Sequence, residues 1–142
     1  MNKIAAVVLL AVLGVLFVSG PLSAHHGNAV YDESKYVTVK GTVTQWVWAN
    51  PHCWLKFDVK DTAGNLVHWI AETSNPPDML NRGWSKQSFK AGDEVAITML
   101  TVKNGEPRGR LRQVVLPDGK TLSNEGGLNP KIPIVPLFGE TK

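Results

Sequence analysis

The chain has 142 residues, an ordinary hydrophobic share of 43% and a formal net charge of +3. Its charged residues are interspersed without long runs, which excludes the concentrated basic surface typical of nucleic-acid binding. A chain of this length forms one compact domain, and its single cysteine excludes an internal disulfide, so the fold depends on packing.

The N-terminal segment has the pattern of an export signal. A positive start at Met1–Lys3 precedes an apolar run over residues 4–18, which is shorter than the about 20 residues of a membrane-spanning helix. Small residues follow and end at Ala24, as they do before a cleavage site. The pattern predicts a signal peptide at residues 1–24, a periplasmic location and no membrane span after cleavage. The alternative is an uncleaved N-terminal anchor.

Two strands with alternating apolar and polar residues meet at an Asn-Pro corner. The first runs from Tyr36 to Trp48, and Gly41 predicts a bend or bulge within it. The second begins at Pro51, because proline and the residue before it favour a turn or extended backbone. The corner itself is Ala49-Asn50-Pro51, so the two strands should lie close to each other in space.

Turn and helix-end signals also delimit the remaining elements. A hairpin loop at residues 61–65 leads to a third strand at residues 65–73, and a short helix is expected between Ser74 and Gly83. Fourth and fifth strands are expected at residues 94–102 and 109–116. This order predicts an all-β fold, a five-stranded OB-like Greek-key barrel with one short helix between strands 3 and 4. The barrel should cover residues 25–122, and a Pro/Gly-rich tail, extended or disordered, should follow at residues 123–142.

Short motifs along this region point to a known family. They are Ala24–His26, Val39–Val43, Trp48–His52, Val67–Trp69 with Glu72, Arg82–Trp84, Lys90–Val95 and Leu116–Gly119. Together they resemble a bacterial family of exported proteins catalogued as domain of unknown function 6152. The resemblance covers residues 24–122 and implies a small secreted or periplasmic β domain. It implies no activity and no catalytic residue.

The histidines suggest a metal site. Cleavage after Ala24 would make His25 the first residue, so that its α-amine and imidazole could chelate one ion. A second imidazole would complete a set of nitrogen ligands that suits Cu(II). His26, His52 and His68 are the candidates, and we favour His52 at the corner. Counting outward from the hairpin loop puts His68 near Asp58 and His52 near Ser74, which separates these two histidines.

Tryptophans suggest a different kind of site. If the apolar faces of the first two strands both point inward, then Trp46, Trp48 and Trp54 lie outside together with His52. Such a face could bind a cell-envelope glycan or a partner protein, since the faces of OB barrels bind oligosaccharides. Alternatively, at least one of these tryptophans covers the end of the barrel.

The sequence favours binding over catalysis. No nucleophile motif of recognised spacing is present, and Cys53 alternates inward with Leu55, where burial should raise the pKa of its thiol. Glu72 and Asp58 are single carboxylates on strands with no evident partner. We therefore expect no enzymatic activity, and no cofactor other than copper.

Overall fold

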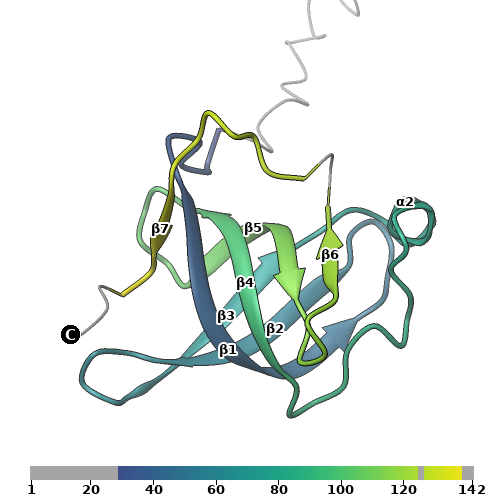
Figure 1. Cartoon of the computed structure of the whole chain (residues 1–142), viewed down its shortest axis with the longest axis horizontal. Helices are drawn as coiled ribbons and strands as arrows, with labels where there is room; N and C mark the ends of the chain where they lie inside the picture. Colours follow the sequence, from purple (N-terminus) through teal and green to yellow (C-terminus); the bar gives the residue numbers. More distant parts are fainter. Residues whose placement is uncertain (1–28, 125–126, 139–142) are drawn as a thin grey trace, which may run out of the picture.

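The computed structural model describes residues 29–124 and 127–138. The predicted signal peptide, His25 and His26 lie outside the described residues. No helix among the described residues is long and apolar enough to cross a bilayer. The elements, shown in Figure 1, are β1 (Tyr36–Val47), β2 (Trp54–Lys60), β3 (Leu66–Glu72), α2 (Pro76–Asn81), β4 (Glu94–Thr101), β5 (Arg108–Val115), β6 (Thr121–Ser123) and β7 (Ile134–Pro136).

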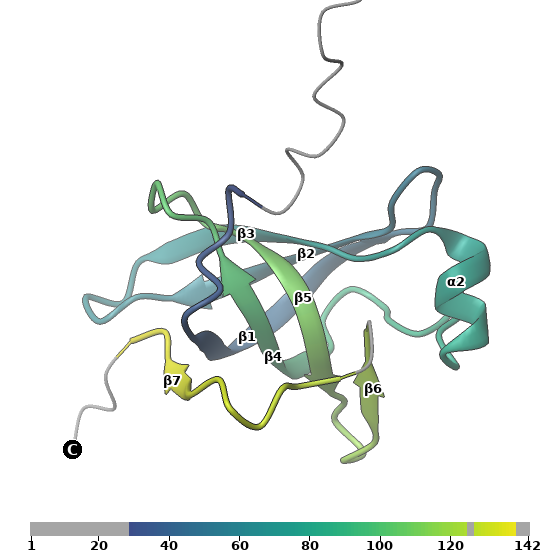
Figure 2. The same cartoon turned by 90° about the horizontal axis from the view of Figure 1, so that it is seen from above.

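Strands β1 to β5 pair in a closed cycle. The order is β2-β3-β5-β4-β1, and β1 also pairs with β2, which joins the two ends of the sheet. The β3–β5 pair is parallel, whereas β1–β2, β2–β3, β1–β4 and β4–β5 are antiparallel. Helix α2 connects β3 to β4 and lies at one end of the barrel (Figure 2). The predicted all-β fold with one short helix after the third strand is confirmed.

The first strand belongs to both sides of the barrel. Its residue Thr42 is opposite Asp58 of β2 and also opposite Glu94 of β4, so β1 passes from one partner to the other at this point. Gly41 lies at this crossing, where an added Cβ atom would stand 2.8 Å from Cδ2 of Phe57 and 3.0 Å from the carbonyl oxygen of Asp58. Glycine is therefore required for close approach of the strands.

The bulge in β1 lies beyond Gly41, and this corrects one expectation. The register with β2 shifts between Val43 and Gln45, so the alternation of faces is inverted after that point. Trp46 is consequently opposite Leu55, which is completely buried. The simple alternation that put Trp46 and Trp48 on the outer face is wrong, because one extra residue moves every later side chain to the other face.

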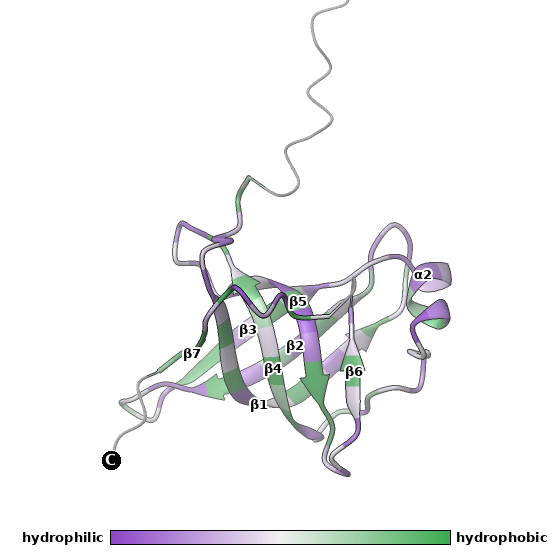
Figure 3. Cartoon of the chain, turned by 45° about the horizontal axis from the view of Figure 1, so that its top comes forward, coloured by the Kyte–Doolittle hydropathy of each residue, from purple (hydrophilic) through white to green (hydrophobic). Residues whose placement is uncertain are grey.

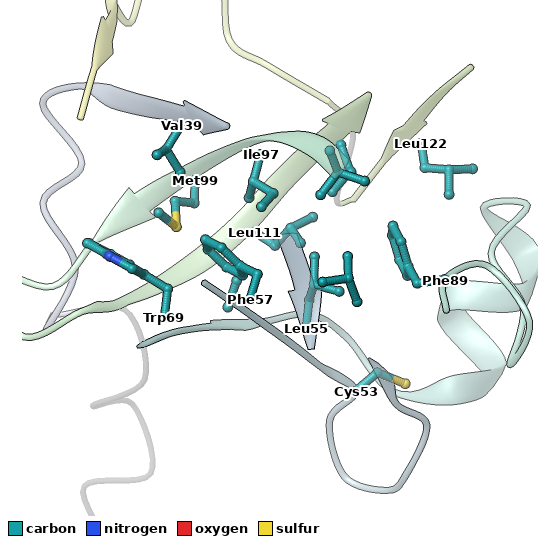
Figure 4. Close-up of a cluster of buried hydrophobic side chains, with 14 of the residues drawn as sticks. Val39, Cys53, Leu55, Phe57, Trp69, Phe89, Ile97, Met99, Leu111 and Leu122 are labelled. Atoms are coloured by element: carbon teal, nitrogen blue, oxygen red, sulfur yellow. The ribbon is translucent and has the colours of Figure 1, made fainter. Parts of the chain in front are cut away.

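The core contains the inward side chains of β2 and β4. Figure 3 shows apolar and polar residues alternating along the strands, and Figure 4 shows the side chains that meet inside. Met99 of β4 and Met79 of α2 are fully buried, so both are packing residues. Trp84 and Phe89 belong to the same cluster and close the end of the barrel near the helix.

Local signals delimit the helix. The side chain of Asn75 accepts a hydrogen bond from the backbone N–H of Asp78, and proline occupies the first helical position. Gly83 has a φ of +82°, a conformation that suits glycine just after a helix. The helix is thus shorter than its predicted limits, but it occupies the predicted place.

The tail lies against the barrel. Strand β7 runs parallel to the start of β1, with Val135 opposite Val37 (Figure 1). Leu137 and Phe138 pack against the main core cluster. The tail was expected to be extended or disordered. The strand β7, and the short strand β6 that pairs with β5, were not expected.

Candidate functional site

The Asn-Pro corner brings His52 to the end of β3. The Asn50–Pro51 peptide bond is cis. Beyond it, the N–H of Cys53 donates to the carbonyl oxygen of Ser74 at 2.9 Å, and the N–H of Thr73 donates to the carbonyl oxygen of Cys53 at 2.9 Å. These bonds extend the β2–β3 pairing past Trp54, so His52 lies beside Thr73 and Ser74, as the counted register predicts.

The ring of His52 is held through one nitrogen. Its Nδ1 lies 3.0 Å from the carbonyl oxygen of Thr73 and 3.3 Å from Oε1 of Glu72. Both partners are acceptors, so Nδ1 carries a proton and, in the neutral ring, the lone pair is on Nε2. The side chain is 42% exposed. His52 can therefore present Nε2 to a ligand or metal ion.

Glu72 lies between three segments of the chain. Its Oε2 accepts a hydrogen bond of 2.8 Å from the hydroxyl group of Tyr31 and lies 3.9 Å from Nη2 of Arg108. Oε1 faces His52, and the carboxylate is 19% exposed. The expectation that Glu72 has no partner is wrong, because its partners come from distant segments. Burial and the bond to Glu72 raise the pKa of Tyr31 to about 12.

The N-terminal arm, which we define as residues 29–32, is attached next to this carboxylate. Tyr31 forms an antiparallel bridge with Val102, and the N–H of Asp32 donates to the carbonyl oxygen of Thr101 at 2.8 Å. Lys103 holds the arm twice: its N–H donates to the carbonyl oxygen of Val30 at 2.9 Å, and its Nζ donates to that of Ala29 at 3.0 Å. The arm is thus fixed by backbone bonds as well as by Tyr31.

The arm and the corner border one pocket, which we call the corner pocket. Ala29 and Tyr31 line it from the arm, His52 from the corner, and Glu72, Lys103 and Arg108 from the neighbouring strand ends and loop. Its volume is about 690 Å³. Glu106 and Arg110 also line it, so the pocket combines an imidazole, two carboxylates and three cations beside the point where the described chain begins.

The predicted tryptophan face is divided in two. Trp54 lies beside His52, with ring centroids 6.4 Å apart, and the guanidinium carbon of Arg108 is 5.4 Å from the Trp54 ring centroid. Trp46 and Trp48 are 5.8 Å apart and pack against the main core cluster. Trp46 also donates from Nε1 to the carbonyl oxygen of Ser85 at 3.0 Å. Only Trp54 thus accompanies His52.

His68 and Cys53 lie apart from the corner pocket. Nδ1 of His68 is 2.6 Å from Oδ1 of Asp58, directly opposite on β2, and the His68 side chain is 82% exposed. This pairing was predicted, whereas Asp58 was expected to have no partner. Cys53 is buried, and burial raises the pKa of its thiol. Within the described ranges, no three His, Cys, Asp or Glu side chains gather where they could hold a metal ion.

Two residues of the pocket were missed from the sequence. Tyr31 falls in a polar stretch without periodicity, and Arg108 lies at the start of the fifth strand with no motif around it. Their proximity to Glu72 arises from pairing between Tyr31 and Val102 and between β3 and β5. Both contacts join segments far apart in the sequence, and no local sequence pattern predicts them.

Comparison with known proteins identifies a family. A model described as "Family of unknown function (DUF6152)" matches residues 12–112, most of the chain. The chain belongs to this family. The match confirms the family resemblance inferred from the motifs, and the family's description assigns no activity. No curated protein and no solved structure matches the chain.

Proposed function

We propose that this family member is an exported, periplasmic binding protein that holds a copper ion between a mature N-terminal His25 and His52. The observation that carries the proposal is the attachment of the N-terminal arm beside the corner. Ala29 and His52 line the same pocket, and the chain preceding Ala29 contains His26 and His25. The proposal requires cleavage after Ala24.

The length of the chain before Ala29 limits how far from Ala29 the residue His25 can lie. Ala29 is four positions after His25, and an extended chain of four residues spans at most about 14 Å. The α-amine and imidazole of His25, with Nε2 of His52, would provide three nitrogen ligands of the kind that Cu(II) prefers. Lys103, Arg108 and Arg110 add positive charge to the pocket, and Glu72 and Glu106 offset part of it.

The other histidines fit the role less well. His68 is paired with Asp58 on the outside of the β2–β3 hairpin, and simple pairing keeps it away from His52. His26 directly follows His25 in the sequence. Binding of one ion by both imidazoles is therefore less favourable than binding by His25 and a residue from another segment. We therefore propose His52 as the second imidazole.

Binding is also favoured over catalysis. Cys53 is the only thiol of the chain, and it is buried with its pKa raised, so that it is a poor nucleophile. The interaction module considered as an alternative would use Trp46, Trp48 and Trp54 for a glycan or a protein. Two of these side chains pack against the core, which leaves Trp54 with Arg108 as a smaller surface for such a partner.

Copper titration of defined N-termini tests the proposal. The chain that begins at His25 is compared with the same chain carrying an additional N-terminal alanine, with His52→Ala and with His68→Ala as the matched control. Affinity and the electron paramagnetic resonance spectrum of Cu(II) are measured. A free N-terminal histidine binds copper in any peptide, so the effect of His52→Ala is decisive.

The alanine extension and His52→Ala should each weaken binding at least about tenfold, which corresponds to about 1.4 kcal/mol. His68→Ala should leave affinity and spectrum unchanged. Equal affinity and spectra in the His25 chain and in His52→Ala would refute the site. Mass spectrometry of the protein from periplasm would report the mature N-terminus and any bound metal; an uncleaved chain would also refute it.

A further inference from the structure

The carboxylate of Glu72 has one partner from each of three segments. Tyr31 belongs to the N-terminal arm, His52 to the corner, and Arg108 to the start of β5. The Tyr31 hydroxyl group is the nearest of the three, with a donor–acceptor distance of 2.8 Å. A largely buried carboxylate is costly unless such donors surround it. Its position therefore favours the arrangement in which the arm and the corner are both in place.

Its two oxygens have different partners. Oε2 accepts from Tyr31, whereas Oε1 lies 3.3 Å from Nδ1 of His52. A carboxylate beside the protonated nitrogen of an imidazole orients the ring and fixes which nitrogen carries the proton. One side chain thus contacts both halves of the corner pocket: Oε2 binds the arm through Tyr31, and Oε1 lies beside Nδ1 of His52, which also faces the carbonyl oxygen of Thr73.

We infer that Glu72 is the positioning residue of this site, which ties the N-terminal arm to the corner through Tyr31 and orients His52 for its ligand. The inference rests on the proposed function for the identity of that ligand. The tie between the arm and the corner rests only on contacts within the described residues, and it can be measured without metal.

Three variants separate positioning from general stability. Glu72→Gln keeps the shape of the side chain but removes its charge, and Tyr31→Phe removes only the hydroxyl group. Tyr36→Phe is the matched control. Tyr36 is buried in the same cluster as Tyr31, and its hydroxyl oxygen accepts a hydrogen bond of 3.1 Å from the N–H of Asn129, away from Glu72.

Hydrogen exchange in the metal-free protein tests the tie. The N–H groups of Asp32 and Lys103 bond the arm to the barrel, so their exchange reports local release of the arm. Tyr31→Phe and Glu72→Gln should each increase exchange at these two amides about tenfold, without equal increases in the β1–β4 ladder. Tyr36→Phe should leave both amides unchanged. Unchanged exchange in Tyr31→Phe and Glu72→Gln would overturn the inference.

Copper binding tests the orientation of His52. Glu72→Gln should weaken Cu(II) binding by about ten- to a hundredfold and alter its paramagnetic resonance spectrum, as is typical of residues behind a ligand. Tyr36→Phe should do neither. If Glu72→Gln lowers the melting temperature but leaves affinity and spectrum unchanged, Glu72 is merely structural and the inference is overturned. If His52→Ala has no effect on copper, the proposed function fails, and hydrogen exchange alone decides the tie.

Discussion

Tyr31 is 3% exposed, yet its hydroxyl group donates to a carboxylate at the edge of the corner pocket. The apolar part of the ring packs in a cluster with Tyr36, Leu100 and Val102. Burial is the main cause of the raised pKa of Tyr31, and the bond to Glu72 is the next. Ionised tyrosine would place a second negative charge beside the carboxylate, so the folded protein favours the protonated form.

This pKa predicts a loss of stability in alkali. The pKa of Tyr31 is raised from 10.0 to about 12 on folding. The stabilisation is therefore fully present below about pH 10 and is lost as the pH rises through about 12. We expect the free energy of unfolding from urea titrations to fall over this range in the wild type and to fall less in Tyr31→Phe. Identical pH dependence in the two proteins would contradict the assignment.

The long strand β1 pairs with both β2 and β4. Where it passes from one to the other, the close packing requires a residue without a side chain, Gly41. A Cβ atom at Gly41 would lie 2.8 Å from the Phe57 ring and 3.0 Å from a backbone carbonyl oxygen of β2. The ring could move slightly, but the carbonyl oxygen belongs to the strand ladder. The close approach of β1 and β2 therefore has little room to adjust.

We expect Gly41→Ala to destabilise the barrel by about 1–3 kcal/mol, the usual cost of overpacking. Lys40→Ala is the control, because the neighbouring Lys40 side chain is exposed and its loss should change stability by less than about 0.5 kcal/mol. Chemical denaturation followed by tryptophan fluorescence measures both. Equal stability of Gly41→Ala and the wild type would mean that β1 and β2 can separate without cost.

The parts of the fold that could be predicted depend on local rules. The hairpin loop at residues 61–65 sets the β2–β3 register, so the pairing of His68 with Asp58 follows from counting alone. The inward face of β2 follows from strict alternation, whereas residues 97–100 of β4 are all buried. The bulge between Val43 and Gln45 could not be predicted, since neither glycine nor proline marks it. That one residue changed the expected environment of Trp46 and Trp48.

The candidate site was predictable only in part, for a similar reason. His52 was singled out because it follows a turn signal in a strand pattern. Tyr31 and Arg108 reach Glu72 through contacts between segments many residues apart, and long-range pairing leaves no periodic trace in either segment. Local sequence patterns therefore predict a role for His52 but not the contacts of Glu72 with Tyr31 and Arg108.

At the scale of the whole molecule, both flanking segments cover the barrel. The arm adds to the end of β4 through the Tyr31–Val102 bridge, and β7 of the tail adds to the start of β1. The arm and the tail meet at a second, smaller buried cluster, which contains Tyr31 of the arm. Leu128 and Ile132 of the tail pack against this cluster. The tail therefore supports the same part of the molecule to which the arm is attached.

Removal of residues 131–142 should consequently destabilise the protein. It deletes β7 and the packing of Ile132, Leu137 and Phe138 against the two clusters. These side chains are only partly buried and ordering the tail has an entropic cost, so we expect a loss of about 1–3 kcal/mol in urea unfolding. Ile134→Ser, at an exposed position of β7, is the control and should change little. A shortened chain as stable as the wild type would show that the barrel does not need its tail.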